Sequence, residues 1–69
     1  MKPSYYYTVP FESTELFRRK LDRLAIPFRL ERDEDGNTMF LLPDLAARNY
    51  ARVRELFGRE YDGTVRWFS

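Results

Sequence analysis

The 69-residue sequence contains neither cysteine nor histidine. The lack of cysteine excludes disulfides, thiolate metal sites and cysteine nucleophiles. The lack of histidine removes the commonest general base and the commonest transition-metal ligand. An excess of one charge is also missing, because twelve Lys and Arg face eleven Asp and Glu, a formal net charge of +1. We therefore expect no cofactor, and the charge does not suggest a dedicated binder of duplex nucleic acid.

Long apolar runs are absent as well. The first residues, Met1-Lys2-Pro3-Ser4, lack the apolar segment of a signal peptide, and no stretch approaches the roughly 20 apolar residues of a membrane span. We expect a cytoplasmic protein without membrane insertion.

The sequence does contain enough apolar residues to fold, 43% hydrophobic and 17% aromatic. At this length one hydrophobic core is the economical arrangement, so residues 1–69 are predicted to form a single domain. A domain this small is usually marginal in stability, which weakly favours self-association.

Turn and cap signals divide the chain into six elements. Ser13-Thr14 and Pro43-Asp44 are typical of helix starts, Pro27 ends the first helix, and Gly36 and Gly63 mark turns. The predicted strands cover 5–11, 28–32, 38–42 and 64–68, and the predicted helices cover 14–26 and 45–60.

The element order is strand, helix, strand, strand, helix, strand. This order is typical of the ferredoxin-like βαββαβ fold, an α+β two-layer sandwich. We expect a four-stranded antiparallel sheet of order 4-1-3-2 with both helices on one face.

Alternation along the strands separates two sets of side chains. One set is apolar and is expected to face the helices: Tyr5, Tyr7, Val9, Phe28, Leu30, Met39, Leu41, Val65 and Trp67. The other set mixes aromatic and charged residues and is expected on the open face: Tyr6, Thr8, Arg29, Glu31, Phe40, Leu42, Arg66 and Phe68.

The open face is the predicted binding surface, because an apolar centre with a charged rim is the layout of an interface. The predicted partner-binding residues are Tyr6, Arg29, Phe40, Leu42, Arg66 and Phe68. One reading is a protein contact, either a homodimer with stacked sheets or a heterologous complex. Another is stacking on single-stranded nucleic acid, but the segment Asn37 to Leu42 lacks the basic, two-aromatic pattern of RNA-recognition strands. A third is that these are ordinary surface aromatics.

Catalytic and metal sites are not indicated. The acidic turn from Asp33 to Asn37 has its glycine too early for a calcium loop. The first turn, Pro10 to Thr14, lacks the glycine-rich anion loop of acyl phosphate hydrolysis. Arginines on both helices alternate with acidic residues, which is typical of a solvated face. We predict that the chain is not an enzyme and has no small-molecule substrate.

Three segments resemble known families: Ala25 to Leu30, Phe40 to Asp44, and the helix from Ala47 to Phe57 with its Tyr50-Ala51-Arg52-Val53-Arg54-Glu55-Leu56 core. They are similar to the N-terminal cytoplasmic domain of bacterial rhomboid proteases and to a family of small ferredoxin-like domains assigned to signal transduction. The resemblance implies a regulatory or adaptor module without activity of its own, and it carries no functional residues. A small inhibitor, for instance from a phage, is also compatible with this size.

Overall fold

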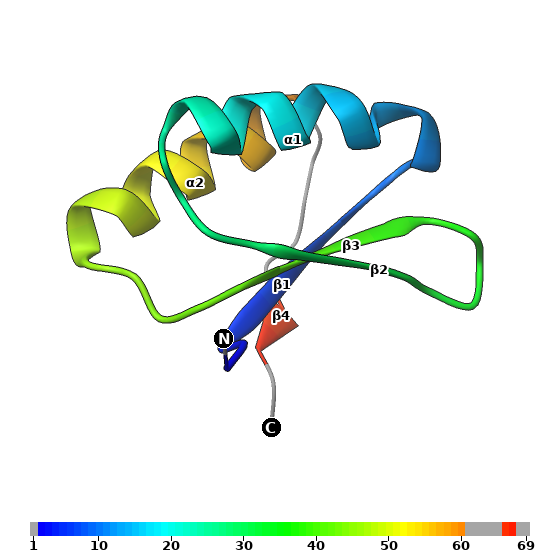
Figure 1. Ribbon diagram of the computed structural model, residues 1–69, viewed down its shortest axis with the longest axis horizontal. Coiled ribbons are helices and arrows are strands. Elements are labelled where there is room, and N and C mark those ends of the chain that lie inside the picture. The colour runs from blue at the N-terminus through cyan, green and yellow to red at the C-terminus, as the bar shows by residue number, and fades with distance from the viewer. Residues whose placement is uncertain (1, 61–65, 68–69) are drawn as a thin grey trace.

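The structure, a computed structural model, describes residues 2–60 and 66–67, with the backbone alone for residues 59, 60, 66 and 67. It is a small α+β fold in which two helices lie on one side of a central antiparallel sheet (Figure 1). The strands are β1 (Tyr5–Val9), β2 (Arg29–Arg32), β3 (Thr38–Leu42) and the two-residue β4 (Arg66–Trp67). The helices are η1 (Phe11–Ser13, one 3-10 turn), α1 (Thr14–Arg23) and α2 (Ala47–Glu60).

The sheet is built around β3, which pairs antiparallel with β1 on one side and with β2 on the other. Tyr7 lies opposite Phe40 in the first pair, and Leu30 lies opposite Phe40 in the second. On the far side of β1, Tyr5 and Tyr6 are opposite Trp67 and Arg66 of β4. Within the described part of the chain, β2 therefore has one neighbouring strand and forms an edge of the sheet.

Both predicted helices form, but α1 ends at Arg23 rather than at residue 26 and α2 begins at Ala47 rather than at residue 45. Ser13 is the N-cap residue of α1 but makes no side-chain capping hydrogen bond. Helix α1 ends in a Schellman motif, with the Ile26 N–H donating to the Leu21 carbonyl and the Ala25 N–H to the Asp22 carbonyl, both at 3.0 Å. Ala25 occupies the left-handed position of this motif at a φ of +57°. Glycine is the usual residue there because a Cβ strains this conformation.

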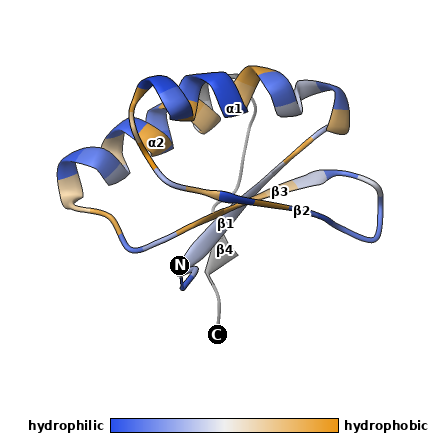
Figure 2. Ribbon diagram, viewed as in Figure 1, coloured by the Kyte–Doolittle hydropathy of each residue, from blue (hydrophilic) through white to orange (hydrophobic). Residues whose placement is uncertain are grey.

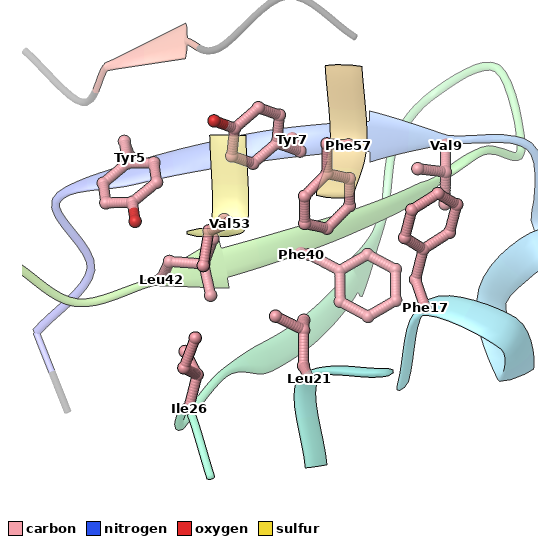
Figure 3. Packing of buried hydrophobic residues seen from close by; sticks show 10 residues of the cluster. All are labelled: Tyr5, Tyr7, Val9, Phe17, Leu21, Ile26, Phe40, Leu42, Val53 and Phe57. Atoms are coloured by element: carbon pink, nitrogen blue, oxygen red, sulfur yellow. The ribbon is translucent and has the colours of Figure 1, made fainter. Parts of the chain in front are cut away.

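A stack of aromatic rings joins the helices to the sheet (Figure 3). The Phe57 ring of α2 lies between Tyr7 of β1 and Phe17 of α1, with ring centroids 4.3 and 4.6 Å away and nearly parallel planes. Phe40 packs under this stack, tilted against Phe57 at 5.7 Å. The core is completed by apolar side chains from each layer: Tyr5, Val9, Leu21, Ile26, Leu42 and Val53.

The β2–β3 hairpin closes through a three-residue loop, which is mostly hydrophilic (Figure 2). The Gly36 N–H donates to the Asp33 carbonyl at 3.2 Å, and Gly36 has a φ of +84°. The Asp33 N–H donates to the Asn37 carbonyl at 3.0 Å, so Asp33 and Asn37 form the last hydrogen-bonded pair of the ladder. This is a type I turn followed by a left-handed glycine, a common three-residue hairpin connection.

Candidate interaction surfaces

The predicted binding residues separate onto two sides of the sheet. Tyr6 and Arg29 lie in one row of the open face, because both are opposite Leu41 in the ladder. Phe40 and Leu42 are fully buried in the core on the helix side, so their predicted position on the open face is wrong. Arg66 is opposite Tyr6 in β4, and Phe68 lies outside the described residues.

The face assignment of the whole of β3 is inverted relative to the prediction. Met39 and Leu41, expected against the helices, are on the open face, whereas Tyr5, Tyr7 and Val9 lie in the core as predicted. The physical reason is that Met39 to Leu42 are four consecutive apolar residues, which carry no alternation that could set the phase. The hairpin loop sets the phase instead, because pairing Asp33 with Asn37 places Phe40 opposite Leu30.

The open face is consequently less apolar and less exposed than predicted. Among described side chains it carries Tyr6, Thr8, Arg29, Glu31, Met39 and Leu41. Leu41 is only 1% exposed despite lying on this face, and Arg29 and Glu31 are paired at 3.9 Å with both side chains about half exposed. Tyr6 is the single aromatic residue of the face among the described side chains, so the stacking platform that nucleic-acid binding would use has lost Phe40 to the core.

Exposed apolar side chains gather instead where η1 meets β2. Phe11 is 54% exposed and Leu30 is 40% exposed. Together they line an open hollow of about 240 Å³, whose other lining residues are Thr14, Glu31, Arg32 and Thr38. The Thr14 and Thr38 hydroxyls hydrogen-bond to each other and connect the start of α1 to β3. We call this surface the β2 groove.

Arg32 gives the β2 groove a cationic rim. Its guanidinium carbon lies 3.9 Å from the centroid of the Phe11 ring, within the distance of a cation–π contact. The contact holds an exposed aromatic ring and an exposed charge in a defined geometry. An apolar side chain that enters the groove would meet Phe11 and Leu30 on its sides and a positive charge at one end.

The backbone along this edge is available for pairing. Hydrogen-bonded pairs alternate along an antiparallel ladder, so the Asp33–Asn37 pair makes Glu31–Met39 and Arg29–Leu41 the bonded pairs of β2 with β3. The N–H and C=O groups of Leu30 and Arg32 then point away from β3. A second strand could add here, and its alternate side chains would reach the groove.

Sequence reasoning missed the β2 groove for two reasons. Phe11 was expected at the end of a strand rather than in a separate 3-10 turn, and Leu30 was expected to be covered by the helices. A signal for the edge was present, because Arg29-Leu30-Glu31-Arg32 is mostly charged, which is typical of edge strands.

The perturbed titratable groups lie away from this groove. Burial raises the pKa of Tyr7 to about 12, with a further increase from Tyr50 and an opposing effect of Arg54. Burial, and then Tyr7, Tyr50 and Asp44, raise the pKa of Tyr5 well above its usual value. Both phenols therefore stay protonated at neutral pH. Within residues 2–60 and 66–67 no group of three or more Asp and Glu side chains is placed to hold a metal ion.

Comparison of the chain with protein-family models, with curated proteins and with solved structures gave no match. In the described ranges, neither helix has the length and apolar character needed to cross a membrane.

Proposed function

We propose that this chain is a non-enzymatic protein-interaction domain of regulatory or adaptor type, which binds an extended segment of its partner along β2 and in the β2 groove. The exposure of Phe11 and Leu30 beside β2, the outer strand of the sheet among the described residues, carries this proposal. The open sheet face, with Tyr6 and Met39, would form the border of the contact. The fold we propose is ferredoxin-like, with a four-stranded sheet of order 4-1-3-2, which the pairing of β4 with β1 supports.

An extended partner suits this surface for two reasons. A strand added to β2 would satisfy the outward N–H and C=O groups of Leu30 and Arg32, which supplies affinity without any sequence preference. The preference would come from the groove, since every second side chain of the added strand would point toward Phe11 and Leu30. A partner strand with an apolar residue and an acidic residue two positions apart would complement Leu30 and Arg32, which lie on the same face of β2.

Selection of displayed random peptides on the immobilised domain tests the proposal. We expect peptides that alternate apolar and polar residues, and we expect Leu30→Ser and Phe11→Ser each to weaken their binding about tenfold. The matched control is Leu16→Ser, because Leu16 is 45% exposed on α1 but does not line the groove.

Two results would refute the proposal. One is a failure to select any peptide that depends on Leu30. The other is binding of an oligothymidine probe that decreases steeply with salt, since this dependence is typical of contacts to phosphates.

A further inference from the structure

We infer that the strand that pairs with β2 is β2 of a second copy of this chain, in the one antiparallel register that is centred on Leu30. This inference rests on the proposed function of the β2 edge and names the partner. It would make a two-fold symmetric dimer in which the two sheets join into one continuous sheet.

Backbone geometry restricts the registers that such a pair can adopt. Leu30 and Arg32 point their N–H and C=O groups outward, whereas Arg29 and Glu31 use theirs on β3. Outward groups must meet outward groups, so the two-fold axis has to pass through a residue position and not between two positions. Within β2, the axis can pass through Arg29, Leu30, Glu31 or Arg32.

The charges distinguish among these four registers. An axis through Arg29 or through Arg32 places two arginines directly opposite each other, and an axis through Glu31 does the same with two glutamates. An axis through Leu30 places Arg29 of each copy opposite Glu31 of the other, twice by symmetry. Opposite charges in cross-strand pairs are stabilising and like charges destabilising, so the Leu30 register is the one that the sequence favours.

The side chains at the centre of this register agree with it. Leu30 meets its own copy, and this contact would cover an apolar side chain that is 40% exposed in the single chain. Arg29 and Glu31 already face the same side of the sheet, where their ion pair within one chain is long, at 3.9 Å. In the dimer each of these charges gains a second opposite charge directly across the new strand pair.

The size of the contact sets the expected strength. The surface buried between two four-residue strands would be well below the roughly 1,200 Å² that standard stable interfaces bury. We therefore expect a weak dimer, which forms as the protein concentration rises and is weakened by high salt.

Charge reversal and mixing test the register. Sedimentation of the full chain over a range of concentrations should show self-association. Arg29→Glu and Glu31→Arg should each weaken it about tenfold or more, because each variant places like charges opposite one another twice. An equimolar mixture of the two variants should associate again, and the double variant R29E/E31R should associate with itself like the natural chain. Arg19→Glu on α1 is the control for a simple change of net charge, since Arg19 is exposed and distant in sequence from β2.

Other outcomes overturn the inference in distinguishable ways. A chain that stays monomeric at all concentrations, yet still selects Leu30-dependent peptides, refutes the self-pairing and leaves the proposed function intact. If self-association is unchanged in Arg29→Glu and Glu31→Arg but is lost in Tyr6→Ala, the contact lies on the open sheet face, and the pairing of β2 with β2 is refuted. A mixture that fails to associate, while the natural chain does associate, would refute the Leu30 register.

Discussion

The inverted phase of β3 makes a sharp prediction for the neighbours Phe40 and Met39. Phe40 is fully buried and contacts three other rings, those of Phe17, Phe28 and Phe57. Removing a buried phenylalanine to alanine costs about 3–5 kcal/mol. A chain of this length has a free energy of unfolding of roughly 3–10 kcal/mol, at about 0.05–0.15 kcal/mol per residue. Phe40→Ala should therefore remove from about a third to all of the stability of the protein.

A milder substitution keeps the difference measurable. Phe40→Leu removes three carbon atoms from the core, which costs roughly 2 kcal/mol at about 0.8 kcal/mol per methylene. Met39→Ala, on the partly exposed open face, should cost at most about 1 kcal/mol. Urea unfolding followed by far-ultraviolet circular dichroism gives both values, and the slope of free energy against urea should be unchanged in either variant.

The same positions can be tested with a charge. Phe40→Arg would bury an unpaired guanidinium among aromatic rings and should prevent folding. Met39→Arg would place the guanidinium beside Glu31 on the open face and should fold. Equal losses at the two positions, or a folded Phe40→Arg protein with an unfolded Met39→Arg protein, would refute the assignment of the two faces.

Two further predictions concern the left-handed helix end and the buried tyrosines. Ala25→Gly should raise the free energy of unfolding by about 0.5–1 kcal/mol, because the φ of +57° is unstrained in glycine. Ala51→Gly, in the exposed interior of α2, should lower the free energy of unfolding by a similar amount. If thermal melting shows a loss of stability in both variants, the backbone strain at Ala25 is refuted. The Tyr7 hydroxyl is buried without a hydrogen-bond partner in the described part of the chain, so Tyr7→Phe should retain or raise stability by about 1 kcal/mol. The pKa of Tyr7 is 10 in the unfolded chain and about 12 in the folded chain. The free energy of unfolding should therefore be level below pH 10 and decrease from there to about pH 12. Urea titrations should show a smaller decrease for Tyr7→Phe than for the natural chain.

The elements of this fold could be predicted from local signals. These signals act over a few residues, so the sequence shows them directly. They are Pro27, the turn from Asp33 to Asn37, and the apolar spacing of Tyr50, Val53 and Phe57. The helix-facing side of β1 was predictable for the same reason. Tyr5, Tyr7 and Val9 alternate with more polar neighbours, and the helices cover only one face of the sheet.

The candidate site could not be predicted in this way, because it depends on how segments that are distant in the sequence pair and pack. The side on which Phe40 falls follows from how many residues close the hairpin, and the exposure of Leu30 follows from which strand lies at the edge of the sheet. Leu30 belongs to the helix-facing set by alternation, yet the helices do not cover it, because β2 is at the edge. Pattern alone assigns a side chain to a face and says nothing about whether the opposite layer extends over it.

The charged residues of β2 have two effects: they oppose pairing with most other strands, and they favour pairing with a second copy of β2 in one register. Charged side chains on an edge strand suppress indiscriminate pairing with other sheets, because most registers and most partners leave like charges or unpaired charges in contact. In Arg29-Leu30-Glu31 the two charges are of opposite sign and symmetric about an apolar residue, so the repulsion is relieved in a single two-fold register. Reversing one charge removes that register while keeping the strand just as charged, which is why the mixed-variant experiment separates specific self-pairing from a generally soluble edge.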